Sequence, residues 1–273
     1  MSLGGRTLIM GVLNVTPDSF SDGGNFLSRE KAVEQALLLE SEGADIIDIG
    51  GESTRPYAEK VSLEQELERV IPVIEEIQSA VKVPISIDTY KAEVAKRALD
   101  AGASIINDIS ALRFDPEMSE LAAENRVPVI LMHMKGSPGN MQNNPVYTDV
   151  TGEIIDFFRE VMEKAEKSGI SKDMLILDPG IGFGKTFDHN LEIIRDLQRL
   201  STLDCPVLLG SSRKAFIGNI LDKQPEERDT GTMATVSAGI INGAHIVRVH
   251  NVKMAAETVK VIDAIRAGRA VNR

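Results

Sequence analysis

The chain has 273 residues, a net charge of −11 and a single cysteine, Cys205. The acidic balance argues against a nucleic-acid partner, and a lone cysteine excludes an intrachain disulfide. No leader-like segment and no run of roughly 18 apolar residues is present, so we expect no membrane contact and a cytoplasmic protein. Aromatic residues make up only 4% of the chain, so the core must be mainly aliphatic.

Eight short apolar runs alternate with segments of helical spacing along the whole chain. This alternation predicts an α/β protein, a closed (β/α)8 or TIM barrel that forms a single domain over residues 1–273. The length agrees, because about 250 residues is typical of this barrel. The predicted strands span residues 8–15, 44–49, 84–88, 104–108, 128–133, 174–178, 206–211 and 245–250.

The helices are legible from their apolar spacing and end signals. Ser28 is expected to cap the first helix, and Ser62 opens a capping-box pattern before the second. Apolar spacing predicts further helices over 153–168 and 254–267. We expect these helices to cover the outside of the barrel.

The carboxyl ends of all strands open on one face of such a barrel, so residues far apart in the sequence meet there. Nearly every predicted strand ends at or close to a polar side chain that can touch a ligand. We therefore expect a single site ringed by Asn14, Glu52, Asp88, Asn107, His133, Asp178, Lys214 and Arg248.

The connections after the first two strands are rich in ligand-binding residue types. The first, NVTPDSFSDGG at 14–24, is long and polar, and we expect it to form a lid. Asn14 can offer an amide oxygen to Mg²⁺, which takes few protein ligands when phosphate oxygens and water are available. The second, GGESTRP at 50–56, carries Arg55, whose guanidinium suits an anion or an aromatic ring, or else a plain surface ion pair.

Asp88, Asn107 and Asp178 each stand at or next to the end of an apolar run. Any one of them alone can be a helix cap or an ion-pair member. Burying all three at one mouth costs free energy that partners must offset. A flat ring with several N–H donors would do so, and Asp178 can accept two parallel hydrogen bonds from a guanidine-like edge.

DPGIGFGK at 178–185 resembles a phosphate-binding loop but is not a Walker A sequence. Gly180 and Gly184 are separated by three residues, where that motif needs four. These glycines are better explained as allowing the chain to turn closely past a ligand. Phe183 would then lie beside that ligand.

SSRKAFIG at 211–218 and RVH at 248–250 add three cations and one imidazole to the ring. Lys214 stands at a helix start, where a cation opposes the helix dipole, so an acid or a ligand carbonyl should lie opposite. Arg248 and His250 are two residues apart on a strand, project to the same side and together suit a phosphate group. His133 has no metal-ligand spacing, and an isolated histidine after an apolar run is more often a core residue.

Eight motifs run in order over nearly the whole chain: MGVLNVTPDSFSDGG, DIGGESTRP, SIDTYK, INDIS, MHMKGSP, LDPGIGFGK, SRK and IVRVH. Together they resemble the dihydropteroate synthases. The resemblance implies a barrel that joins 6-hydroxymethyl-7,8-dihydropterin diphosphate to 4-aminobenzoate, forms 7,8-dihydropteroate and releases pyrophosphate. It also implies Mg²⁺ as cofactor, a homodimer through the last helices, and the folate step that sulfonamides target.

The resemblance implies three groups of site residues. Those that hold the pterin are Asp88, Asn107, Met132, Asp178, Lys214 and Arg248. Those at the diphosphate and magnesium are Asn14, Thr54, Arg248 and His250, with Asn14 as the metal ligand. Those that line the aminobenzoate site are Thr54, Arg55, Pro56, Phe183 and Ser212, closed by the lid that contains Asp22.

The implied chemistry follows from charge. Mg²⁺ and cationic side chains spread the negative charge of the departing diphosphate, so a dissociative break of the C–O bond is expected. Carboxylates then stabilise the pterin cation until the neutral aromatic amine attacks. The implied catalytic residues are Asp22, Asp88, Lys214, Arg248 and His250.

Two alternatives keep the pterin pocket but change the function. A methyltransferase-type barrel would pass a methyl group to a corrinoid, and a non-catalytic barrel would only bind pterin. The lid and the SRK and RVH motifs favour the synthase, because they supply groups for an anionic substrate. The sequence departs from the family pattern at Ala215, where some members carry a hydroxyl residue, so backbone amides at the helix start must hold the aminobenzoate carboxylate.

Overall fold

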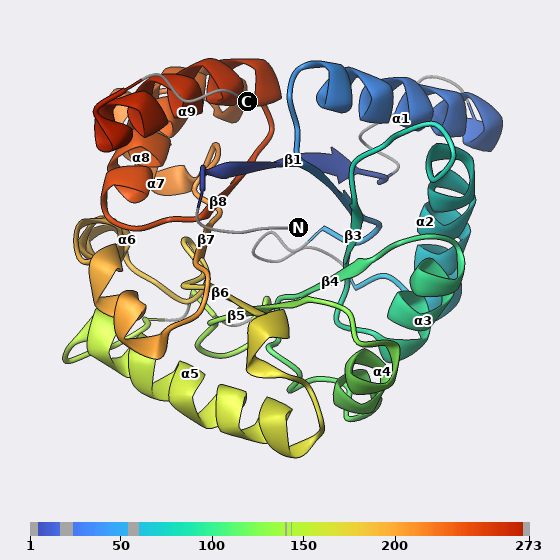
Figure 1. The fold of residues 1–273 in the computed structure, drawn as a ribbon, viewed down its shortest axis with the longest axis horizontal. Helices are drawn as coiled ribbons and strands as arrows, with labels where there is room; N and C mark the ends of the chain where they lie inside the picture. The colour runs from blue at the N-terminus through green and yellow to red at the C-terminus, as the bar shows by residue number, and fades with distance from the viewer. Residues whose placement is uncertain (1–4, 17–23, 54–59, 140, 143, 270–273) are drawn as a thin grey trace.

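Parallel strands form the centre of the molecule and helices surround them (Figure 1). The structure is a computed structural model that describes residues 5–16, 24–53, 60–139, 141–142 and 144–269. The strands are β1 (Leu8–Asn14), β2 (Ile46–Gly50), β3 (Ile85–Asp88), β4 (Ile105–Asp108), β5 (Val129–Met132), β6 (Leu175–Asp178), β7 (Leu208–Leu209) and β8 (Ile246–Val249). The helices are α1 (Gly24–Ser41), α2 (Leu63–Ile77), α3 (Ala92–Asp100), α4 (Glu117–Asn125), α5 (Val150–Lys167), α6 (Phe187–Arg195), α7 (Ala215–Leu221), α8 (Asp229–Ile241) and α9 (Val252–Ala267), with short 3₁₀ helices η2 (Lys172–Met174), η3 (Leu197–Leu203) and η4 (Pro225–Glu227).

The sheet closes on itself, which confirms the predicted barrel. Its strand order is β6-β5-β4-β3-β2-β1-β8-β7, and each neighbouring pair is parallel. The two end strands meet at a bridge between Leu177 and Val207. There the Leu177 N–H donates to the Pro206 carbonyl at 2.8 Å. Within the described ranges, no helix has the length and apolar character that crossing a membrane requires.

Alternate residues of each strand face the barrel interior. Outward residues such as Ile9, Ile47 and Leu177 join the core that lies under the helices. The same in-and-out alternation continues to the carboxyl end of each strand. There, at the mouth, the inward-facing residues are polar. The interior below that mouth is an apolar layer of Leu8, Met10, Ile46, Ile105, Ile130, Ile176, Leu208 and Ile246.

The helix starts differ from the apolar pattern. The Ser62 capping box is confirmed, but α1 begins at Gly24, so the prediction that Ser28 caps it is wrong. The helices predicted over 153–168 and 254–267 begin earlier, at residues capped by Asp149 and Asn251. A cap is a polar residue before the apolar repeat, which is why spacing alone places the start too late.

Strand β7 is much shorter than the predicted run over 206–211. Pro206 has no N–H to give to a neighbouring strand. The N–H of Val207 donates instead to the ring of His245, with 3.1 Å between the backbone nitrogen and Nδ1. Only Leu208 and Leu209 therefore pair as a regular strand with β8.

We predict that Asp263→Ala destabilises the barrel. The buried Asp263 carboxylate on α9 accepts hydrogen bonds from the backbone N–H (2.8 Å) and hydroxyl (2.7 Å) of Thr7, just before β1. Leaving both donors unpaired should lower the free energy of unfolding by about 2–5 kcal/mol, measured by urea denaturation. Glu257→Ala, exposed on the same helix, is the control and should change it by less than about 0.5 kcal/mol. Equal losses in the two variants would contradict this role.

Candidate active site

A charged network lies on the inner side of four strands at the barrel mouth. Arg248 of β8 donates from Nε to Asp48 of β2 at 2.6 Å and from Nη2 to Asp88 of β3 at 2.8 Å. The Asn107 side chain of β4 donates to the same Asp48 oxygen at 3.0 Å. The structure thus brings together Asp88, Asn107 and Arg248, as the sequence predicts.

Asp48 is the member of this network that the sequence reading missed. It is fully buried in the middle of β2, so it does not stand at a strand end like the residues that were singled out. One signal was present: a charged residue inside the apolar run ADIIDI, two positions from Ile46 and therefore on the same inward face. Its partner, Arg248, explains how a buried carboxylate is tolerated there.

Two buried oxygen atoms in and beside the network form no hydrogen bond within the described residues. Asp48 Oδ1 and Ser86 Oγ are buried and have no hydrogen-bond partner among the described residues. Asp48 and Ser86 are paired in the register of β2 and β3, so these atoms belong to one layer of the interior. Buried polar atoms without partners cost free energy, and a ligand with N–H donors would remove that cost.

Burial perturbs the carboxylates at the mouth. It raises the pKa of Asp88 to about 7, although the Arg248 guanidinium opposes the rise. Burial also raises the pKa of Asp178, opposed by a hydrogen bond from the Gly180 N–H (2.7 Å) and by the charges of Lys214 and Arg248. A cationic or donor-rich ligand would favour the ionised form of both groups.

An apolar wall stands beside these polar groups. Met132 at the end of β5 and Phe183 after β6 share a cluster with Ile109, Met134 and Met141. The Nζ of Lys214 lies 4.1 Å from the centre of the Phe183 ring, a cation–π contact. The mouth therefore offers a flat, polarizable surface next to hydrogen-bonding groups, which suits an aromatic heterocycle.

Ser212 and His250 lie together after β7 and β8. Ser212 Oγ and His250 Nδ1 are 2.9 Å apart, and the His250 N–H donates to Ser212 Oγ at 3.2 Å. His250 follows β8, which carries Arg248, and Ser212 follows the neighbouring strand β7. The Ser212 hydroxyl and the His250 imidazole can therefore form hydrogen bonds to an anionic group.

Asn14 suits a metal ion that takes most of its ligands from phosphate oxygens and water and few from the protein. It is the last residue of β1, at the mouth, and its side chain is exposed. In the part of the chain that the structure describes, no group of three His, Cys, Asp or Glu residues could hold a metal ion. Such a donor set suits Mg²⁺ bound mainly by phosphate oxygens and water.

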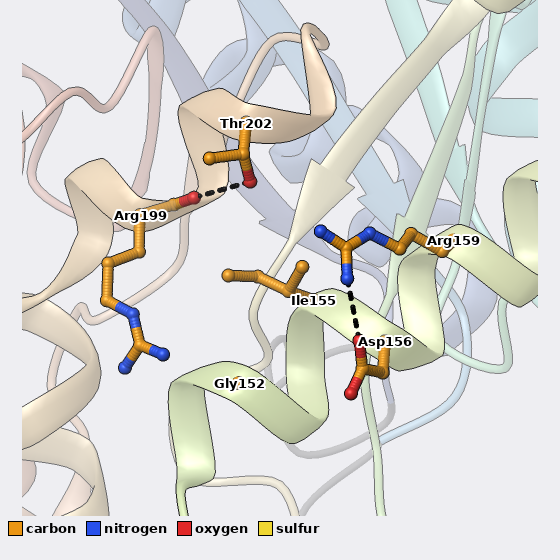
Figure 2. Close-up of a pocket in the computed structure, with 6 residues that line it drawn as sticks. All are labelled: Gly152, Ile155, Asp156, Arg159, Arg199 and Thr202. Atoms are coloured by element: carbon orange, nitrogen blue, oxygen red, sulfur yellow. Dashed lines mark hydrogen bonds and ion pairs between the residues drawn. The ribbon is translucent and has the colours of Figure 1, made fainter.

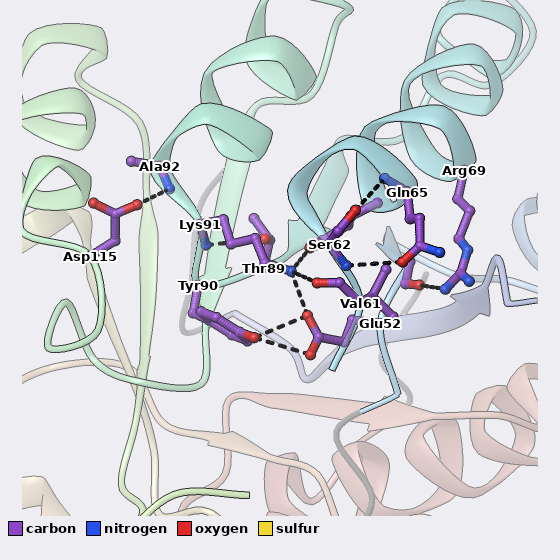
Figure 3. Close-up of polar contacts among 12 residues, drawn as sticks. Glu52, Val61, Ser62, Gln65, Arg69, Thr89, Tyr90, Lys91, Ala92 and Asp115 are labelled. Atoms are coloured by element: carbon purple, nitrogen blue, oxygen red, sulfur yellow. Dashed lines mark hydrogen bonds and ion pairs between the residues drawn. The ribbon is translucent and has the colours of Figure 1, made fainter. Parts of the chain in front are cut away.

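Two residues expected in the ring contact other groups. The β2 strand ends before Glu52, whose carboxylate accepts from the Tyr90 hydroxyl (3.0 Å) and Lys91 Nζ (2.6 Å), as Figure 3 shows. His133 follows inward-facing Met132 and so points outward. There its ring packs on Phe157, with 4.8 Å between the two ring centres. His133 is thus the buried core histidine that its isolation indicated.

Several predicted residues lie outside the described residues. They belong to the connections after β1 and β2, where a lid and part of the aminobenzoate wall were expected. They are Asp22, Thr54, Arg55 and Pro56.

A surface cavity of about 290 Å³ lies away from this mouth, between α5 and η3 (Figure 2). Arg159 and Arg199 border it, but each guanidinium is already paired, with Asp156 at 2.8 Å and with Asp149 at 2.7 Å. The lining offers few other polar groups to a ligand. The barrel mouth is therefore the stronger candidate for a functional site.

Comparison with known proteins decides the family. A model of the pterin binding enzyme family matches residues 10–250. A dihydropteroate synthase from Synechocystis sp. is 51% identical over 263 residues, which cover 96% of this chain and 91% of that relative. The chain belongs to the dihydropteroate synthase family. This membership confirms the family and the transferase class that the motifs predicted.

Solved dihydropteroate synthases share the fold. The Clostridium difficile enzyme, crystallised in the presence of pteroic acid, has a TM-score of 0.92 and 45% identity, and the match covers 97% of this chain and 98% of that one. The Xanthomonas albilineans dihydropteroate synthase with 4-aminobenzoic acid has a TM-score of 0.90 and 46% identity, with 96% and 94% covered.

We predict that Asp48→Ala weakens both the fold and pterin binding. It leaves Arg248 Nε and the Asn107 amide without their acceptor, and breaking a buried ion pair costs about 3–5 kcal/mol of stability. Calorimetric titration of the folded variant with a free pterin should show an affinity at least about tenfold lower. Asp156→Ala, which removes an exposed pair on α5, should change neither quantity appreciably. A folded Asp48→Ala protein with normal pterin affinity would refute the role of the network.

Proposed function

We propose that the barrel mouth catalyses dihydropteroate synthesis. The reaction joins 6-hydroxymethyl-7,8-dihydropterin diphosphate to 4-aminobenzoate, giving 7,8-dihydropteroate and pyrophosphate. The observation that carries the proposal is the network of Asp48, Asp88, Asn107 and Arg248 inside the barrel mouth, in a chain of this family. Its relatives solved with pteroic acid and 4-aminobenzoic acid support the choice of substrates.

The pterin is held by donors and acceptors fixed on strands. Asp178 has one oxygen occupied by the Gly180 N–H, and it offers its remaining acceptor capacity to the guanidine-like edge of the ring. Asn107 and Asp88 supply further polar contacts, and Met132 covers a face of the ring. Arg248, oriented by two carboxylates, presents its guanidinium plane to the heterocycle.

The diphosphate binds on the other side of Arg248. His250 faces it after β8, with its ring held by Ser212 of the connection after β7, and Lys214 lies at the start of α7. Mg²⁺, held by Asn14 and by substrate oxygens, would neutralise charge on the leaving group when bound. Arg248 and His250 orient the diphosphate and spread its negative charge.

The transfer needs no protein nucleophile. The C–O bond breaks with its electron pair going to the diphosphate oxygen, and the cation left on the pterin methylene is delocalised into the ring. Ionised Asp88, with Asp22, stabilises that cation. The neutral amine of 4-aminobenzoate then forms the C–N bond, and its proton leaves to a carboxylate or to diphosphate. Phe183, Ser212, Thr54, Arg55 and Pro56 line the site that orients the amine.

We propose a homodimer that forms through the last helices. Val261 and Ile265, one turn apart on α9, are 58% and 66% exposed, and Ile241 at the end of α8 is 61% exposed. α8 and α9 pack against each other, so we infer that these exposed apolar side chains form one contact surface.

Cys205, buried and free of any disulfide, agrees with a cytoplasmic enzyme.

A pyrophosphate-release assay with each substrate omitted in turn tests the function. Release should require the pterin diphosphate, 4-aminobenzoate and Mg²⁺ together, because the amine traps the cation and the metal neutralises the leaving group. Dihydropteroate should appear in equal amount, measured by chromatography. Release that ignores 4-aminobenzoate would contradict the synthase. Pterin binding without any release would indicate a non-catalytic barrel, and methyl transfer to a corrinoid would indicate the methyltransferase type.

We predict that His250→Ala weakens binding of the diphosphate substrate more than binding of a free pterin. The variant loses one contact to the anionic arm, which should cost about tenfold in affinity for the pterin diphosphate. Affinity for 6-hydroxymethylpterin should stay within about twofold, measured by calorimetry. His245→Ala, at the opposite end of β8, is the matched control and should leave the ratio of the two affinities unchanged. Equal losses for both ligands in His250→Ala would place His250 away from the diphosphate.

A further inference from the structure

Lys185 is a buried cation that the proposed mechanism does not use. It lies in the connection between β6 and α6 and is 3% exposed. Its Nζ is 2.8 Å from the Phe183 carbonyl, 3.0 Å from His133 Nδ1 and 3.3 Å from the His133 carbonyl. An ammonium group has three N–H donors. The three acceptors, drawn from two separate segments, can take all of them.

The surroundings make this cation costly. Burial lowers the pKa of Lys185 to about 7, opposed by the charge of Asp178. In the described part of the chain, Lys185 forms no ion pair with a carboxylate. Burial and the neighbouring cations lower the pKa of His133 to about 2, so its ring is neutral and its Nδ1 can accept. The hydrogen bonds and the charge of Asp178 together offset the cost of burying Lys185.

The two segments that Lys185 joins are in direct backbone contact. Gly180 has φ +70°, and a Cβ there would lie 2.0 Å from the His133 carbonyl oxygen. Gly184 has φ +63°, and a Cβ there would lie 2.6 Å from the Lys135 carbonyl oxygen. Only glycine fits both positions. Lys185 fastens this close approach, because one ammonium binds the backbone of both segments.

The fastened segment carries Phe183. Lys185 holds the Phe183 carbonyl, while the Phe183 N–H donates to the Gly180 carbonyl at 3.1 Å. With both peptide groups fixed, the ring is directed into the cluster with Met132 and against Lys214. The orientation of this wall thus depends on a side chain that is buried behind it.

We propose that Lys185 is a positioning residue that fixes Phe183 in the wall of the aminobenzoate site. The inference rests on the proposed function, which places 4-aminobenzoate against Phe183. Lys185 makes no hydrogen bond to the strand-end network. The charges of Lys214 and Arg248 act on Asp178 more strongly than that of Lys185, so the pterin side should be little affected by its removal.

The test compares the two substrates in Lys185→Met, which replaces the apolar stem of the side chain by one of similar length and removes the ammonium donors. KM for 4-aminobenzoate should rise about tenfold, the effect of losing hydrogen bonds that order the wall. Affinity for 6-hydroxymethylpterin, measured by calorimetry, should stay within about threefold and so reports an intact barrel. An unchanged KM, or equal losses for both ligands, would overturn the proposal.

A double-mutant cycle with Phe183→Ala shows whether Lys185 acts through Phe183. If it does, adding Lys185→Met to Phe183→Ala should raise KM for 4-aminobenzoate by less than about twofold more. Fully additive effects would overturn the proposal. Lys96→Met, an exposed lysine on α3, is the control and should match the unsubstituted chain.

If Lys185→Met does not fold, Lys185→Gln decides. Its amide keeps N–H donors but is too short to reach all three acceptors, so the same selective rise in KM is expected. Normal values, or equal losses for both ligands, would again overturn the proposal. The unsubstituted chain, assayed in parallel, tests the proposed function separately: its failure to form dihydropteroate would refute that function, whatever the variants show.

Discussion

The charge of Arg248 must be balanced inside the barrel, and the arrangement of the mouth depends on that requirement. Its two carboxylate partners, Asp48 and Asp88, come from β2 and β3, whereas Arg248 lies on β8. β8 lies beside β1, and β1 beside β2. The curvature of the closed sheet then turns the inner faces of β8, β2 and β3 toward one another. The same closure turns Asn107 and Asp178 toward a common centre. Fold and site are therefore consequences of one geometry.

The strands and their connections have different tasks at this mouth. Strand residues supply the hydrogen-bonding groups for the heterocycle, and their positions follow from the backbone register. The connections supply Phe183, Ser212 and Lys214, whose positions depend on glycine turns and on side chains buried beneath them. Lys185 belongs to this second group. A rigid polar floor is thus combined with a wall whose shape is set by the contacts between neighbouring connections.

The barrel and the inward-facing strand-end residues could be predicted from the sequence because parallel strands alternate in and out with a fixed period. Asp88, Asn107 and Arg248 were found in this way. Asp48 escaped notice because it stands inside an apolar run, and its partner is 200 positions away. Lys185 could not be found by periodicity, since its environment is made by the folding of two irregular segments. Glu52 was assigned to the ring because it closely follows a strand, but a motif does not show that its carboxylate pairs with Tyr90 and Lys91.

The shortness of β7 gives the cylinder a seam. Between β6 and β7 the strands meet at the Leu177–Val207 bridge, whereas β1 pairs with β2 over five residue positions. Transient opening of the fold should start at this seam, and its amide protons should exchange with solvent sooner than those of β1. Asp178 lies on one side and Ser212 and Lys214 on the other, so a molecule that touches both sides would act as a clasp. Binding of such a ligand would then slow the transient opening of the barrel.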